Sequence, residues 1–303
     1  MEHLRTDAAT ASTGRARGYR PVAADTGVRV GSRMSRRLYY LALILLALYS
    51  LGPLVVFLFT ALKSQSELAT NPLGPPHHWV WSNFVQAWDQ GDIGTGLKNG
   101  AILTIGTALG VCVIAGLAAH AMARLDLPGT NGVILYLIAV TVLPIQLFLV
   151  PLFELWSRLH LYNTLIGLMI IYWAVFSPFA TLLLRSFMVA LPHDFEDAAR
   201  IDGAGELGVL WRVTVPLVAP GFLTVALVSG LAAWNQFLLA VTFLQSPNLM
   251  PISLSLFQFQ QGYTQNYALV SAAAVFMLVP MVVLFLALQR RFVAGLSVGG
   301  LGG

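Results

Sequence analysis

Six long apolar segments limit what this chain can fold into. They cover roughly residues 38–62, 97–119, 133–156, 165–187, 217–243 and 268–289. Each is long enough to cross the hydrocarbon layer of a membrane as a helix, which takes about 20 mainly apolar residues. The chain is 57% hydrophobic and only 10% charged, which is more apolar surface than one water-soluble domain could bury. The sequence therefore predicts an all-α polytopic membrane protein with six transmembrane helices.

The basic residues predict how these spans are oriented. Eight of the seventeen Lys and Arg residues precede Leu38, and others lie in the second loop, in or beside the fourth loop and after the last span: Arg124, Arg185, Arg200, Arg212, Arg290 and Arg291. The positive-inside rule then places both termini and these two loops in the cytoplasm. Residues 1–37 are predicted to be a disordered basic cytoplasmic tail, 38–289 the six-helix transmembrane domain, and 290–303 a cytoplasmic C-terminal tail. Lys63 and Lys98 are the exceptions on the outer side, where we expect their side chains to snorkel to the interface. The uneven charge indicates membrane orientation rather than nucleic-acid binding.

One charged stretch interrupts the apolar chain, from Leu191 to Leu217. Pro192 can open a turn, Asp194 is a plausible N-cap, and a short helix is predicted over 195–202. Gly203 fits the left-handed position that commonly ends a helix. A second short helix is predicted to end at the Val-Thr-Val-Pro segment, because Pro216 disfavours helix in the residue before it. Local physics alone allows an ordinary amphipathic surface helix equally well.

The spacing within this stretch resembles the loop by which the membrane subunit of an ABC importer contacts its ATPase. The pattern is Glu-Ala-Ala, three residues, Gly, nine residues, then Ile-x-Leu-Pro, and it falls on Asp197, Ala198, Ala199, Gly203, Val213, Val215 and Pro216. Three of these seven positions are conservative departures. The resemblance implies a type I importer permease bundle of the MetI-like kind, with a coupling loop at about 188–216 that docks in a groove of the ATPase. It implies ATPase-coupling roles for Glu196, Asp197, Ala198, Ala199, Asp202, Gly203 and Pro216.

The resemblance extends to four other segments: Ala61–Glu67, Asn71–Pro76, Ala233–Leu238 and Leu288–Leu296. They are similar to sugar permeases of the binding-protein-dependent, maltose-type carbohydrate uptake family, and to its smaller six-span permease subunit. This implies a subunit in the cell membrane that pairs with a second permease, two ATPase subunits and an extracytoplasmic sugar-binding protein. It also implies that ATP and magnesium bind the ATPase subunits, and that this chain holds no cofactor.

Polar residues within the spans are candidates for a solute path. Trp234, Asn235 and Gln236 lie together in the fifth span, and Gln146 lies in the third. An indole can stack on the apolar face of a sugar while amides bond its hydroxyl groups. Hydrogen bonding between helices at the interface with the second permease accounts for the same residues equally well.

The uncharged segment from Gln245 to Asn266 is predicted to be an outer loop. In the resembled family this loop reaches the sugar-binding protein, which implies contact roles for Gln245, Asn248, Gln258, Gln260 and Tyr263. A neutral outer loop of no special purpose is the alternative.

Two other functional classes compete with the importer subunit. An ion-coupled secondary transporter usually keeps ionisable groups near the bilayer centre, whereas Glu154, Arg185 and His120 lie near the ends of the predicted spans. An ATP-hydrolysing enzyme would need a Gly-x4-Gly-Lys-Ser/Thr phosphate loop, which this sequence lacks. The prediction is therefore a transport subunit that is not itself an enzyme, with the secondary transporter as the alternative.

Overall fold

The computed structural model describes residues 33–259 and 266–300 as helices and the segments that connect them. The chain divides into two compact units, Met1–Gly52 and Pro53–Gly303. Most of the predicted N-terminal tail, residues 1–32, lies outside the described residues. The helices in chain order are α1 (Arg33–Ala61), α2 (Gln65–Thr70), α3 (Ser82–Gln90), α4 (Ile93–Arg124), α5 (Thr130–Val142), η1 (Ile145–Phe148), α6 (Leu149–Arg158), α7 (Leu165–Val189), α8 (Asp194–Ile201), α9 (Glu206–Val209), the π-helix η2 (Leu210–Thr214), α10 (Val215–Leu217), α11 (Ala219–Trp234), α12 (Leu238–Phe243), η3 (Pro247–Leu249), α13 (Ile252–Gln258) and α14 (Tyr267–Gly300).

Helices long enough to cross a membrane account for most of the predicted spans. Four qualify alone: Arg37–Ala61, α4, α7 and the Tyr267–Ala287 part of α14. Two bent pairs qualify together, Thr130–Val142 with Ile145–Arg158 at 91° and Glu206–Leu217 with Ala219–Trp234 at 83°. Counting each bent pair as one span gives up to six in the described residues, so the predicted all-α polytopic fold is confirmed. α14 continues as a helix to Gly300, past the predicted end of the last span.

The third predicted span is not one straight helix. α5 ends at Val142, and Leu143 and Pro144 take extended backbone conformations before η1 begins. The proline ring disfavours helix in the preceding residue, and Pro144 has no N–H to donate within a helix. The span therefore breaks at this proline and bends by 91°.

The fifth predicted span differs at both of its ends. The helix preceding it does not stop at the Val-Thr-Val-Pro segment: it continues from Glu206 through the π-helix η2 to Leu217, with Pro216 inside it, and the break comes at Val218. At the other end α11 stops at Trp234, and the Asn235 side chain donates to the Leu231 carbonyl (2.9 Å). This local side-chain bond satisfies a carbonyl at the end of the helix, and α12 starts again at Leu238.

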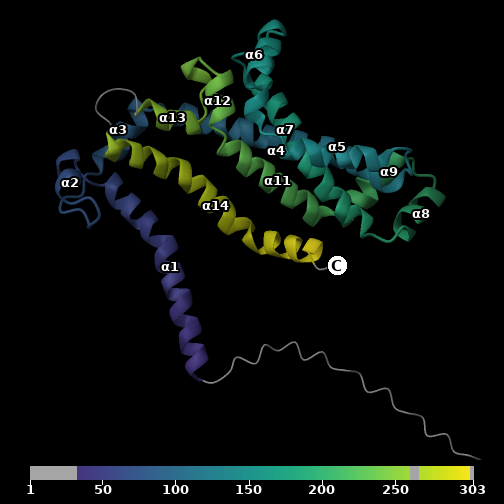
Figure 1. The fold of residues 1–303 in the computed structure, drawn as a ribbon, viewed down its shortest axis with the longest axis horizontal. Helices are drawn as coiled ribbons and strands as arrows, with labels where there is room; N and C mark the ends of the chain where they lie inside the picture. Colours follow the sequence, from purple (N-terminus) through teal and green to yellow (C-terminus); the bar gives the residue numbers. More distant parts are fainter. Residues whose placement is uncertain (1–32, 260–265, 301–303) are drawn as a thin grey trace, which may run out of the picture. The chain divides into compact units, whose positions relative to one another are not determined.

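The core of the second unit forms around α4, which packs against α7 and α11 (Figure 1). Trp173 of α7 donates its indole N–H to the Gly106 carbonyl (2.9 Å). A Cβ on Gly110 would meet the same ring, so only glycine permits this approach. Tyr172 is completely buried beside it. Both aromatic residues therefore serve the packing of α4 on α7.

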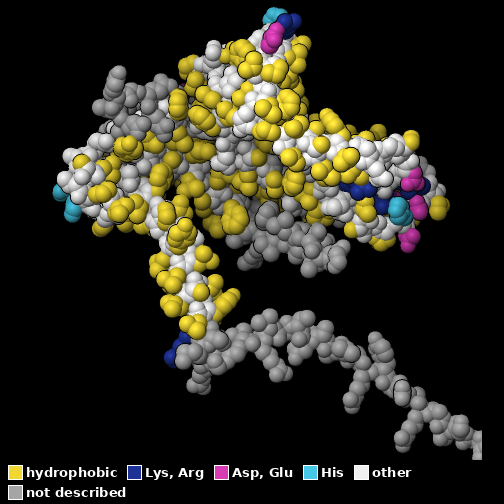
Figure 2. Space-filling view, viewed as in Figure 1, with side chains coloured by type: hydrophobic (Ala, Val, Ile, Leu, Met, Phe, Trp, Pro, Cys, Tyr) yellow, Lys and Arg dark blue, Asp and Glu magenta, His cyan; other side chains and the backbone are white. Residues whose placement is uncertain are grey.

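Charged side chains gather at one end of this helix bundle and at the tip of α6. α8 and α9 lie at one end, whereas α3 and α13 lie at the other (Figure 1). Charged and histidine side chains cluster over α8 and α9, and again at the tip of α6, on a surface that is otherwise largely apolar (Figure 2).

Lys63 does not snorkel as predicted. Its side chain is completely buried, and its Nζ donates to the carbonyls of Asn71 (2.6 Å) and Pro72 (3.4 Å). The segment after α1 folds over the ammonium group and replaces its water with backbone oxygens, which satisfies a charge that would otherwise be costly to bury.

Candidate functional site

The charged stretch forms a short helix close to the predicted one. α8 runs from Asp194 to Ile201, one residue earlier than predicted, and His193 rather than Asp194 is its N-cap residue. The His193 carbonyl accepts from the N–H groups of Glu196 (2.9 Å) and Asp197 (3.0 Å). Asp194 instead lies in the first turn, where its carboxylate suits the positive end of the helix dipole.

The end of α8 follows the prediction for Gly203. Its φ is +85°, the left-handed region in which side chains are disfavoured. The N–H of Ala204 bonds the Ala199 carbonyl and the N–H of Gly203 bonds the Arg200 carbonyl, both at 3.0 Å. This pair of bonds is a Schellman motif, which satisfies the last carbonyls of the helix.

Glu196 lies inside the protein, although it was grouped with the predicted coupling surface. Its Oε2 lies 2.8 Å from Nε of Arg124, the last residue of α4, and each side chain is only 1% exposed. Its Oε1 accepts from the hydroxyl of Thr214 in η2 (2.9 Å). The buried ion pair therefore joins α8 to α4, and the hydrogen bond from Thr214 joins α8 to η2.

Arg124 also binds the end of α7. Its Nη2 donates to the carbonyls of Met188 (2.7 Å) and Leu191 (3.0 Å). Its Nη1 lies 3.1 Å from Nε2 of His193, and this ring nitrogen must accept because a guanidinium can only donate. One buried side chain thus fixes the start of α8 to the ends of two long helices. In the sequence, Arg124 is evidence for orientation alone, and nothing in its local context predicts these partners.

A second, exposed set of charges holds α8 to α9. Arg200 donates to Asp197 Oδ1 (2.8 Å) and to both carboxylate oxygens of Glu206 (2.9 and 3.2 Å). Nε2 of His120 on α4 lies 3.5 Å from the Glu206 carboxylate. The loop after Gly203 is therefore bound to α8 by charge as well as by backbone bonds.

The remaining predicted coupling residues lie on or near the outer side of α8. Asp197, Ala198, Asp202 and Gly203 are exposed, Ala199 is half-buried, and Pro216 is exposed on α10. Phe195 and Ile201 are exposed beside them, at 53% and 86%. Small, apolar and acidic side chains thus share one surface that nothing in the described chain covers, and we call the exposed surface of α8 and Gly203 the α8 surface.

The four candidates for a solute path have different surroundings. Trp234 is buried in the core, where its indole N–H donates to the Met277 carbonyl (3.2 Å) and its ring lies against Gly100. Asn235 caps α11, Gln236 is half-buried, and Gln146 is exposed in η1. The contacts of Trp234 show that its side chain packs and hydrogen-bonds between helices of this chain.

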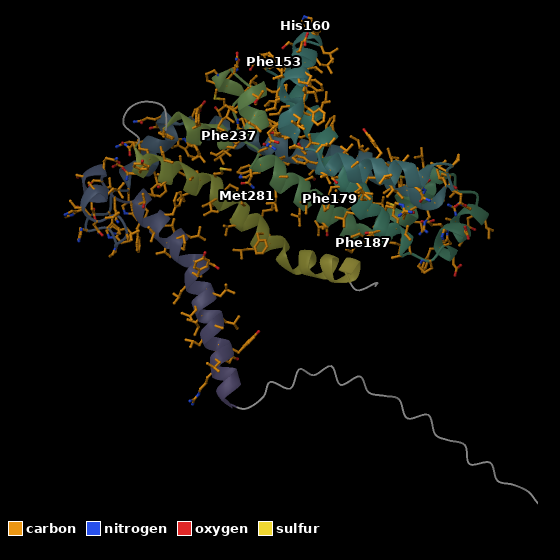
Figure 3. All side chains as sticks on the ribbon, viewed as in Figure 1. Phe153, His160, Phe179, Phe187, Phe237 and Met281 are labelled. Atoms are coloured by element: carbon orange, nitrogen blue, oxygen red, sulfur yellow. The ribbon has the colours of Figure 1, made fainter. Side chains whose placement is uncertain are left out.

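Two apolar hollows border α7 instead. One of about 540 Å³ lies between α7 and the bent α5–α6 segment, and one of about 210 Å³ lies between α7 and α11. Phe179, labelled in Figure 3, lines both of them. Among the described residues, the linings of both hollows exclude the four path candidates.

The predicted outer loop is partly ordered by two asparagines that sequence reasoning missed. Oδ1 of Asn163, in the α6–α7 connection, accepts from the N–H groups of Gln245 (2.9 Å) and Ser246 (3.0 Å), and its Nδ2 donates to the Ser246 hydroxyl (2.7 Å). Asn99 of α4 donates to the carbonyls of Asn248 (2.9 Å) and Met250 (3.2 Å). The side chains of Gln245 and Asn248 remain exposed. Gln258 ends α13, whereas Gln260 and Tyr263 lie outside the described residues.

Replacing Asn163 should release the start of this loop. Asn163 has φ +55°, so Asn163→Gly removes the side-chain bonds while keeping a residue that tolerates this backbone. We expect the Gln245 and Ser246 amides to exchange hydrogen about five-fold faster, since each lost hydrogen bond contributes about 1 kcal/mol. Hydrogen–deuterium exchange of the peptide spanning these amides measures this. His160→Gly is the matched control, because exposed His160 also has a positive φ (+57°), and it should leave the exchange unchanged. Equal exchange in all three proteins would show that Asn163 does not order the loop.

Comparison with known proteins places this geometry in a family. Residues 110–298, which include α8, match the model of the binding-protein-dependent transport system inner membrane component. The sulfoquinovosyl glycerol transport system permease protein SmoH of Agrobacterium fabrum is 35% identical over 267 residues, covering 88% of this chain and 94% of that protein. The diacetylchitobiose uptake system permease protein NgcG of Streptomyces coelicolor is 32% identical, covering 89% and 91%.

A solved structure has the same fold. It is a bacterial ABC transporter involved in the import of the acidic polysaccharide alginate, and one of its chains superimposes with a TM-score of 0.74 at 21% identity. The match covers 86% of this chain and 99% of that chain. With the helical architecture and the family match over most of the second unit, this shows that the protein belongs to the family of inner-membrane components of binding-protein-dependent transport systems.

Proposed function

We propose that this chain is the permease subunit of an ATP-driven importer and forms half of a translocation pore with a second permease. The solute is a sugar or oligosaccharide delivered by an extracytoplasmic binding protein. The family match and the solutes named for the two similar permeases support this class of solute. The chain itself is a transport subunit and not an ATPase; two partner ATPase subunits hold the ATP and magnesium.

The observation that carries the proposal is the way in which α8 is attached. Its outer side is exposed and suited to a partner, whereas its inner side is fixed to α4 and α7 through the buried Glu196–Arg124 pair. A displacement of α8 would therefore move α4 and α7 with it, because buried contacts join the three helices directly. We propose that closure of the ATPases on ATP pushes α8, and that this movement opens the pore toward the binding protein. Hydrolysis then resets it.

The orientation follows from the same proposal. The α8 surface must face the ATPases, so it lies in the cytoplasm together with both termini, as the distribution of basic residues also favours. The segment from Gln245 onward then faces the extracytoplasmic binding protein, with Gln245 and Asn248 available for contact. Gln146 and Gln236 remain as candidates for the solute path.

Purification of the tagged full-length chain from mildly solubilised native membranes tests the assembly. We expect a second permease, an ATPase and a sugar-binding protein to co-purify, as identified by mass spectrometry. An unrelated tagged polytopic protein from the same membranes is the control. Recovery of the chain alone or as a homo-oligomer, under conditions that preserve a known importer, would contradict the proposal and favour an ion-coupled secondary transporter.

A further inference from the structure

Helix α3 has an exposed apolar face that the transport function does not explain. Trp81, Val85 and Trp88 follow one another at i, i+4 and i+7, which places them on one side of a helix. They are 63%, 63% and 42% exposed. A second side, formed by Asn83 and Ala87, is buried against the bundle, and a third side is polar. α3 therefore buries one side and exposes two, of which one is apolar.

Contacts with three other helices fix the direction in which this face points. Asn83 donates its side-chain amide to the carbonyls of Ala61 (2.9 Å) and Lys63 (2.8 Å), at the end of α1. Phe84 and Trp88 both stack edge-on against Phe276 of α14, with ring centroids 5.7 and 5.2 Å apart. The Trp88 ring also lies over Gly94, in the first turn of α4. The face cannot turn inward without breaking these contacts.

The exposed face continues onto a membrane span. From Phe276 to Ala287, the exposed side chains of α14 are aliphatic or aromatic, and they include Val279 and Val283. On its other side, Trp79 stacks on Trp81 with ring centroids 6.2 Å apart and is 55% exposed. Trp88 thus lies beside the first turn of the α4 span, and Asn83 of the same helix bonds Ala61, the last residue of the α1 span. Tryptophan is enriched at this level, where its ring is apolar and its N–H reaches water.

We propose that α3 is an interfacial helix whose Trp81, Val85 and Trp88 lie in the headgroup layer of the bilayer. A water-facing site for another protein is disfavoured, because the face adjoins the span surface of α14 directly. The sequence of α3 contains no Lys or Arg, so the interaction is with the apolar boundary of the layer rather than with anionic headgroups. The inference requires membership of the membrane family but not any particular solute or partner.

Site-directed fluorescence tests the position of this face in the full-length chain. Cys112→Ser removes the chain's single cysteine, and single cysteines are then placed at Val85 and Trp88. Gln86 and Gln90, exposed on the polar side of the same helix, are the matched controls. Each protein is purified with the subunits that accompany it, labelled with an environment-sensitive fluorophore and reconstituted in phosphatidylcholine vesicles. The probes are a brominated phosphatidylcholine and aqueous iodide.

We expect brominated lipid to quench the labels at positions 85 and 88 at least about two-fold more than those at 86 and 90, and iodide to show the opposite order. Adding phosphatidylglycerol should not change the lipid quenching. Equal iodide access at all four positions would overturn the proposal, as would protection of 85 and 88 from both quenchers, which would indicate a protein contact. If the Trp88→Cys protein does not fold, the conservative Val85→Cys variant decides the result. Because no transport is measured, failure here leaves the proposed function untouched.

Discussion

Replacing Glu196 with glutamine is expected to destabilise the folded chain by about 3–5 kcal/mol. The amide keeps the size of the side chain and can still accept from Thr214, but it no longer neutralises Arg124. Both side chains are 1% exposed, so water cannot solvate the guanidinium that is left without a counter-charge. The loss should appear as a lower denaturant midpoint or melting temperature of the purified protein in lipid nanodiscs.

Asp197→Asn is the matched control for this prediction. It makes the same chemical change one residue along the chain, in an ion pair with Arg200 whose aspartate is 59% exposed. Exposed pairs contribute about 0–1 kcal/mol, so the control should stay close to the parent protein. A double variant, Glu196→Leu with Arg124→Met, should recover much of the loss, because it removes both buried charges. Equal and small effects of Glu196→Gln and Asp197→Asn would show that the buried pair does not hold α8.

The second large effect is expected at Gly203, where aspartate should abolish uptake while leaving the spans inserted. Among the described residues, a Cβ at this position would have no heavy atom within 4 Å, so the substitution causes no clash inside the chain. The left-handed backbone costs a non-glycine residue about 1–2 kcal/mol, too little to unfold the bundle. The added side chain and charge would instead obstruct the approach of a partner to the α8 surface. We expect at least about ten-fold less ATPase to co-purify, equivalent to 1.4 kcal/mol of binding.

Two variants separate the causes of this loss. Gly205→Asp adds the same charge two residues further on, at φ −74° and with open space around it, and should retain the ATPase. Gly203→Asn adds a neutral side chain that tolerates the left-handed conformation, and it should lose ATPase if close approach is required. Uptake of the sugar that the co-purified binding protein carries is the functional measurement. Normal uptake by Gly203→Asp would disprove the coupling role of this loop.

Features that depend on local chemistry could be predicted from the sequence. The apolar segments are long enough to span the membrane, and the helical fold follows from that length. The left-handed conformation of Gly203 follows from its place after an amphipathic helix. The exact start of the helix could not be predicted. The side chain of Asp194 favours it as the N-cap, whereas in the structure His193 holds that position without a side-chain cap, and its carbonyl accepts the first helical bonds.

Features that depend on contacts between distant segments could not be predicted. Hydropathy measures length and composition, so it does not show that the third span bends at Pro144. Glu196 and Asp197 are neighbours of like charge, yet one is buried and the other exposed, and the distant residues Arg124 and Thr214 contact only the buried one. Nothing local in the sequence marks Asn163 or Asn99, because an asparagine that orders a remote loop has the same side chain as any other asparagine.

Because of the Glu196–Arg124 contact, the α8 loop cannot be transferred to another protein on its own. Consider a chimera in which residues 188–216 alone replace the loop of a permease that has no basic residue at the position of Arg124. Such a chimera would contain a buried carboxylate without the guanidinium that neutralises it. The graft would also lose the donor that joins the ends of α7 and α4. We therefore expect a graft of this loop to fold stably only if the last turn of α4, with Arg124, is transferred with it.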